Sequence, residues 1–129
     1  MKKLSKATLV KRLEKRCDEL WAEAVKKRDH HRCRFCGKGK PEVVVQAHHI
    51  IKRGRKSLRW DTGNGIALCS GHHGYWAHLP GNETIYTAWL EGEIGRKQLD
   101  FLNSEANRIQ IVTYAWLQDV EQKLMEETR

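Results

Sequence analysis

The chain has 129 residues, 40% hydrophobic and 31% charged, a composition that fits one compact globular domain and excludes disordered, low-complexity and collagen-like classes. Its formal net charge of +8 is unevenly spread, since residues 1–60 carry 19 Lys or Arg against 6 Asp or Glu, whereas residues 61–129 carry 5 against 10. The longest stretch without charged side chains, 62–82, is too polar for a membrane span, and the charged N-terminus lacks the apolar run of a signal peptide, so we expect a cytoplasmic, unexported protein.

The first predicted element is an amphipathic helix over about residues 6–28. Its apolar residues recur at steps of three and four, and Lys and Arg side chains cover the opposite face. The members of the apolar stripe are Leu9, Leu13, Cys17, Leu20, Trp21 and Ala24. A basic surface of this kind attracts polyanions, and nucleic acid is the commonest polyanion partner of a basic domain. The alternative is a basic helix face that is merely solvated.

The cysteines after this helix have the spacing of metal ligands. Cys33 and Cys36 form a Cys-x2-Cys pair, and after 32 intervening residues Cys69 and His72 form a Cys-x2-His pair. Because each two-residue gap lets one tight turn direct both ligands at a single ion, the pattern predicts a structural zinc site. The alternative is that the three cysteines are small buried apolar residues. Cys17 lies apart as a spare thiol.

A short α+β core is predicted between the two cysteine pairs. The β-branched run 43–45 leads into residues 47–51, which indicates a strand ending at the histidine pair. Residues 52–63 form a basic loop, and residues 66–68 give a second strand into Cys69. The basic side chains of the loop are candidates for phosphate contacts, with a solvated loop as the alternative: Arg53, Arg55, Lys56 and Arg59.

The rest of the chain is predicted to be helical. One helix should follow over about residues 71–79 and end at Pro80 and Gly81. The apolar residues between Trp89 and Leu124 indicate two or three further helices.

The histidines exceed what one zinc site needs. All seven lie between residues 30 and 78, although a site with three cysteines needs only one of them. The ordered text CRFC, AHHI and NGIALCSGHH resembles the zinc-bearing HNH endonucleases, the ββα-metal nucleases, over about residues 17–80. The resemblance implies an α+β fold, a ββα-metal centre flanked by N- and C-terminal helices, and hydrolysis of DNA phosphodiester bonds.

The resemblance also implies roles for particular residues. His48 and His73 would bind a catalytic divalent metal such as Mg²⁺ or Mn²⁺, His49 would be the general base, and Asn64 would orient His49. Many relatives have a further histidine four residues after the position of His73, whereas His78 follows after five, so His78 is an additional candidate ligand.

Each assignment has a simpler alternative. His48 and His49 are also explained as polar residues at a strand end, and adjacent strand residues serve one centre only if the strand bends or ends there. Asn64 between two glycines is also a good turn former. His72 and His73 could exchange roles, and the two-residue gap favours His72 as the zinc ligand.

A narrower likeness lies in residues 20–37 and 48–64, which are similar to phage and prophage HNH proteins, including the NinG-type recombination nucleases. Those nucleases lack the second histidine of the 72–73 pair, so a role in DNA recombination, processing or packaging follows only loosely.

The sequence therefore predicts one nuclease domain over residues 1–129 that cleaves DNA in a bacterial or phage-infected cell. It divides into a basic helix (1–30), a zinc and ββα-metal core (31–80) and a helical extension (81–129). The oligomeric state, monomer or homodimer, stays open. A zinc-ribbon DNA-binding module without catalysis is the alternative, but such a module has no use for the surplus histidines.

Overall fold

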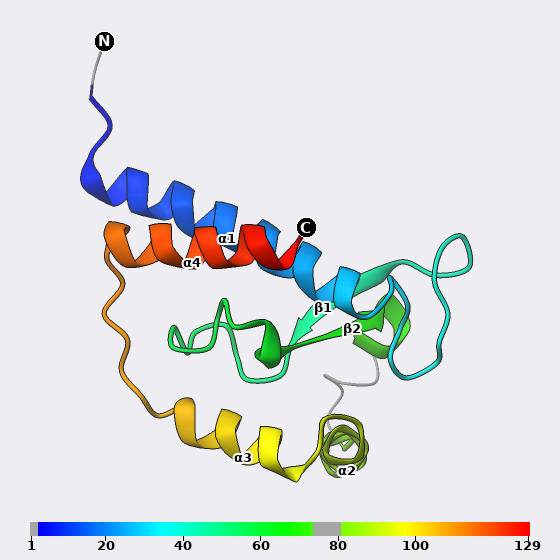
Figure 1. Ribbon diagram of the computed structural model, residues 1–129. Coiled ribbons are helices and arrows are strands. Elements are labelled where there is room, and N and C mark those ends of the chain that lie inside the picture. The colour runs from blue at the N-terminus through cyan, green and yellow to red at the C-terminus, as the bar shows by residue number, and fades with distance from the viewer. Residues whose placement is uncertain (1–2, 74–80) are drawn as a thin grey trace.

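The computed structural model describes residues 3–73 and 81–129 and has an α+β architecture, as predicted (Figure 1). A two-stranded hairpin lies between α1 and α4 on one side and α2 and α3 on the other (Figure 1). In chain order the elements are α1 (Lys6–Arg28), β1 (Val45–His49), the 3-10 turn η1 (Thr62–Asn64), β2 (Gly65–Cys69), α2 (Glu83–Ile94), α3 (Arg96–Glu105) and α4 (Tyr114–Glu127). The expected first helix, both strands and three C-terminal helices are confirmed.

Helix α1 forms where the sequence pattern places it. The Ser5 hydroxyl accepts a hydrogen bond from the Thr8 backbone N–H and caps the first turn. The apolar stripe of α1 packs on α4, and the buried members of this core include Leu13, Cys17, Trp21, Leu117 and Leu124. Burial of this stripe supplies most of the stability that a single amphipathic helix lacks in water.

The hairpin is antiparallel, with Val45 opposite Cys69 and His49 opposite Gly65. All five residues of β2 are buried. A Cβ atom at Gly65 would lie 2.5 Å from Val25 Cγ2 and 2.6 Å from Trp21, so only glycine lets the strand approach α1 this closely. On the other side β2 contributes to a second apolar cluster with α2 and α3, which includes Ile66, Leu68, Leu90 and Leu99.

The helix expected over residues 71–79 lies mainly outside the described residues. Helical conformation begins at Ser70, directly after β2. The candidate ligand His78 also lies outside the described residues. In the part of the chain that is described, none of the helices is both long and apolar enough to cross a bilayer.

Candidate functional site

The two cysteine pairs meet at one point. Their ligand atoms all lie within 4.8 Å of one another, and the residues are Cys33, Cys36, Cys69 and His72. The Sγ atoms of Cys36 and Cys69 are 3.9 Å apart, and His72 Nδ1 is 3.1 Å from Cys69 Sγ and 3.6 Å from Cys33 Sγ. Tetrahedral zinc with Zn–S bonds of about 2.3 Å separates its sulfur ligands by about 3.8 Å. The donor set and its spacing therefore fit one zinc ion.

Backbone geometry prepares Cys33 to act as a thiolate. Burial of this thiol would raise its pKa, but the backbone N–H groups of Cys36, Cys69 and Phe35 point at its Sγ and hold the pKa below the ordinary value. These donors come from both halves of the cluster, the 33–36 turn and the end of β2. The fold thus brings the ligands together through its own hydrogen bonds.

A separate histidine pair lies on the α2 side of the hairpin. The ring centroids of His48 and His73 are 4.9 Å apart, and His48 is buried at 5% exposure. Gln46 Oε1 lies 2.7 Å from His73 Nδ1, and because an amide oxygen only accepts, Nδ1 carries the proton and Nε2 is the atom that can bind a metal. The Tyr86 hydroxyl lies 3.1 Å from His48 Nε2. Two imidazoles held in this way can serve as ligands of a divalent cation.

His49 is held on the opposite, α1 face of the same strand end. Its ring stacks on Trp21 with centroids 3.8 Å apart and planes 7° from parallel. Nε2 donates to the Arg59 carbonyl at 2.9 Å, so in the neutral ring Nδ1 is the unprotonated, basic nitrogen. Burial, together with the charges of Arg53 and Arg59, lowers the pKa of His49. The ring is therefore neutral at physiological pH and able to accept a proton.

Asn64 holds the loop that positions His49. The side chain is fully buried, its Oδ1 accepts from the Ile51 N–H at 2.7 Å, and its Nδ2 donates to the carbonyls of Ile51 at 3.0 Å and Leu58 at 3.2 Å. Leu58 directly precedes Arg59, whose carbonyl binds His49. Asn64 therefore acts on His49 through the loop, and its role in orienting His49 stays a prediction.

The four loop cations that were predicted to contact phosphate have different surroundings. Arg59 makes two hydrogen bonds to Asp18, of 2.7 and 3.0 Å, and its side chain is only 11% exposed. Lys56 pairs with Glu14 at 3.0 Å. Arg53 lies 3.2 Å from Asp18 but is 64% exposed, and Arg55 is exposed. Of these four, Arg53 and Arg55 thus have most access to a phosphate.

The histidines face a hollow of about 730 Å³ at the end of the hairpin. Its lining includes His48, His49, His73, Arg53 and Tyr86. The strand ends at His49, and this is why residues on its two faces reach one hollow.

Gln46, Tyr86 and Trp21 support these histidines and were missed by the sequence reasoning. Gln46 could have been found, since it shares a strand face with His48 two residues later. Tyr86 and Trp21 belong to helices whose packing no local pattern reveals. Trp60 is a buried core residue whose Nε1–H donates to Asp18.

Comparison with known families matches residues 33–78 to a model described as HNH endonuclease. Comparison of the chain with curated proteins and with solved structures gave no significant match. The matched segment spans the cysteine cluster, the hairpin and the histidines. This segment, less than half of the chain, is similar to HNH endonuclease domains, and the likeness points to a nuclease that acts on DNA.

Proposed function

We propose that this protein is a metal-dependent DNA endonuclease that cleaves phosphodiester bonds in the hollow lined by His48, His49 and His73. The observation that carries the proposal is the convergence of these three histidines at one strand end, inside the segment that matches HNH endonucleases. The cluster around Cys33 has four ligands of its own and is proposed to hold a structural zinc ion.

His48 and His73 would hold the catalytic cation. When bound, a divalent metal supplies charge neutralisation at the phosphate and at the leaving oxygen. Two imidazoles favour a first-row transition ion such as Mn²⁺ over Mg²⁺, which prefers oxygen ligands. Because few protein atoms are used, positions remain for water and a phosphate oxygen.

His49 would act as the general base. Its Nε2–H is bound by the Arg59 carbonyl, so Nδ1 is the atom that takes the proton from the attacking water. Trp21 and the Arg59 carbonyl fix the plane and the tautomer of the ring. Arg53, at the edge of the hollow, would neutralise a phosphate oxygen of the substrate.

The decisive experiment compares the native protein with His49→Ala on supercoiled plasmid, with Mg²⁺ or Mn²⁺ added and zinc content equal. We expect metal-dependent cleavage by the native protein and a loss of 100-fold or more in the variant, about the contribution of a general base. The control is Gln118→Ala, which removes an exposed polar side chain of α4 outside this hollow and should cleave normally. If the native protein binds plasmid but cuts it with neither metal, the chain is a zinc-stabilised DNA-binding module instead.

A role in phage DNA recombination or processing is the finer part of the proposal. It is supported by the likeness of residues 20–37 and 48–64 to NinG-type nucleases. Cleavage of branched DNA at least ten times faster than of a linear duplex of the same length would favour it. Equal rates on the two substrates would count against it.

A further inference from the structure

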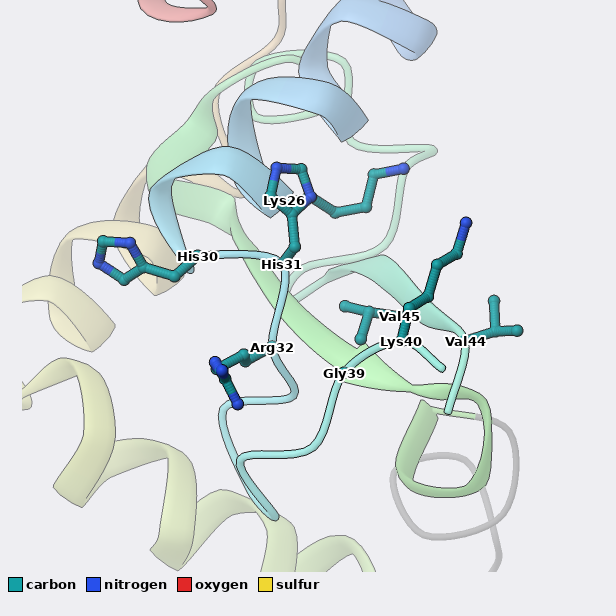
Figure 2. Close-up of a pocket in the computed structure, with 8 residues that line it drawn as sticks. All are labelled: Lys26, His30, His31, Arg32, Gly39, Lys40, Val44 and Val45. Atoms are coloured by element: carbon teal, nitrogen blue, oxygen red, sulfur yellow. The ribbon is translucent and has the colours of Figure 1, made fainter. Parts of the chain in front are cut away.

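A second hollow lies between the C-terminal end of α1 and the segment 39–45, away from the histidine centre (Figure 2). Its volume is about 440 Å³. It is lined by basic and small apolar residues: Lys26, His30, His31, Arg32, Gly39, Lys40, Val44 and Val45. Among the described residues that line it there is no Asp or Glu. The hollow is therefore a concentration of positive charge without an internal counterion.

The basic side chains of the hollow point to two different sides of it. Lys26 and Lys40 extend toward the same side of the hollow, and the His31 ring lies beside Lys26, whereas His30 and Arg32 point to the other side (Figure 2). The acid that pairs with Lys26 is Glu23, one turn earlier, at 3.9 Å and with half of its side chain exposed. An ion pair of this length in solvent is weak, so it leaves the ammonium available to an anion.

The last turn of α1 uses its other cations for the fold. Lys27 donates to the Thr128 carbonyl at 2.7 Å. Arg28 donates to Asp29 and to the carbonyls of Thr62 and Gly65. Lys26, by contrast, is directed into the hollow (Figure 2).

The backbone that shapes the hollow is held in an unusual conformation. His30 and His31 have φ angles of 57° and 56°, in the left-handed region that favours glycine or asparagine. A Cβ atom at Gly39 would lie 2.8 Å from the His31 carbonyl oxygen, so glycine is what allows the chain before Lys40 to approach His31. Two consecutive strained residues that are retained in a structure are typical of functional sites.

The negative end of α1 does not oppose an anion here. The backbone N–H groups of Asp29, His30 and His31 cap the carbonyls of Val25, Lys27 and Lys26. Capping by these donors reduces the negative partial charge at the end of the helix. The field in the hollow is therefore set by the side-chain cations.

We propose that this hollow binds a backbone phosphate of the DNA, apart from the phosphate that is cleaved. The inference rests on the proposed function. Val45 in the hollow and His49 in the histidine centre lie on the same face of β1, four residues apart, which corresponds to roughly 13 Å. Because successive nucleotides of one strand rise about 3.4 Å along the duplex, this spacing is about four nucleotides. A single duplex can therefore reach both places.

The test measures affinity for a 20-base-pair duplex over a range of salt concentrations, in the full chain carrying His49→Ala and without added Mg²⁺ or Mn²⁺. We expect Lys26→Gln with Lys40→Gln to reduce the slope of log K against log salt by about 1, the value for one lost phosphate contact. The matched control is Lys97→Gln with Lys123→Gln, two exposed lysines on α3 and α4 that remove the same charge. The control should leave the slope unchanged.

The two proposals fail in different ways. An unchanged slope for the Lys26 and Lys40 variant, or an equal loss in the control, overturns the phosphate hollow even if the native protein cleaves plasmid. If the slope falls as expected but the native protein never cleaves, the hollow stands and the nuclease proposal fails.

A second arm separates a DNA phosphate from free phosphate. The imidazole NMR signals of His31 are followed at constant ionic strength while either the duplex or inorganic phosphate is added. We expect the duplex to shift these signals at concentrations at least a hundred times lower, because its other contacts hold the phosphate in place. Equal potency of inorganic phosphate would mean that the hollow is a site for a free anion and would overturn the DNA assignment.

The variant His31→Asn tests the shape of the hollow separately from its lysine charge. Asparagine tolerates the left-handed backbone, so the turn should be kept while the imidazole is lost. We expect weaker duplex binding, by about threefold, with an unchanged unfolding temperature. Binding equal to that of the native protein would exclude His31 from the contact.

Discussion

The cysteine cluster and the histidine centre take neighbouring residues of the chain, His72 and His73, yet they are built differently. The cluster has four ligands with all ligand atoms within 4.8 Å, and three of its members are thiols. The histidine centre has two imidazoles with centroids 4.9 Å apart, at the edge of a hollow of about 730 Å³. A closed set of ligands stabilises a fold, whereas an open set leaves room for a substrate.

The cysteine cluster and the histidine centre both depend on the end of β2. Cys69 is the last residue of the strand, His72 joins the cysteine cluster, and His73 meets His48. Neighbouring histidines thus serve different centres because the chain turns directly after the strand. We expect the cysteine cluster, the closed centre, to determine whether the protein folds. The histidine centre, the open centre, should determine whether it cleaves DNA.

The largest effect is expected from Cys69→Ser. A structural zinc ion contributes on the order of 10 kcal/mol to folding, so loss of one thiolate should abolish both the bound zinc and the cooperative unfolding transition. Zinc content and thermal unfolding followed by circular dichroism measure these effects.

The matched control for this variant is Cys17→Ala. Cys17 is fully buried between α1 and α4, and burial raises its pKa to about 12, so its thiol is inert. It should keep one zinc per chain and lose only about 1 kcal/mol. Normal zinc content in Cys69→Ser would show that the cluster is not a zinc site.

The next largest effect is expected from Asn64→Ala, which breaks the support of the open centre. The substitution leaves the buried backbone groups of Ile51 and Leu58 without their partner, and we expect a loss of about 4 kcal/mol in the free energy of unfolding. Zinc should stay bound, and cleavage measured below the unfolding temperature should fall at least tenfold because His49 loses its fixed loop. Unchanged cleavage would separate Asn64 from the function of His49.

Much of this architecture could be predicted from the sequence because it depends on local patterns. The spacing of apolar residues identified α1, and the two-residue gaps identified the members of the cysteine cluster. Interactions between distant segments were missed. The ion pairs of Arg59 with Asp18 and of Lys56 with Glu14 on α1 were not foreseen, and the phosphate role of these two cations stays a prediction. Such pairing follows from packing, which no local pattern encodes.

Asp29 links the two halves of the closed centre without using metal. Its buried carboxylate binds Arg28, Arg34 and the Ala67 N–H, and so joins the end of α1 to the 33–36 turn and to β2. We expect Asp29→Asn to cost about 3 kcal/mol at pH 7, as for a broken buried ion pair. Unfolding by denaturant in the zinc-bound protein measures this cost.

The pH dependence of this cost has a defined sign. Burial acts to raise the pKa of Asp29, but the hydrogen bonds from Arg28 and Ala67 and the charges of Arg28 and Arg34 hold it below the ordinary value. The carboxylate therefore contributes its full stability above the unfolded pKa of about 3.9, and this contribution is lost as the pH falls through the folded pKa. The difference in the free energy of unfolding between the native protein and Asp29→Asn should stay constant from pH 7 to about pH 4.5. A decline already between pH 7 and pH 5 would contradict this account.

The smallest effect is expected from Tyr86→Phe, which alters the open centre by one hydroxyl. The Tyr86 hydroxyl lies 3.1 Å from His48 Nε2, and burial raises the pKa of Tyr86, so the group stays protonated. If this oxygen accepts from Nε2–H, it holds His48 in the tautomer whose Nδ1 can bind a metal, and its removal should weaken metal affinity about tenfold. The Mn²⁺ concentration for half-maximal cleavage should rise by that factor while the rate at saturating Mn²⁺ changes little. An equal Mn²⁺ requirement would mean that the hydroxyl does not act on the metal ligand, and a lower one that it competes with the metal for Nε2. The open centre would then change its contacts on binding, whereas the closed centre has its four ligand atoms together already.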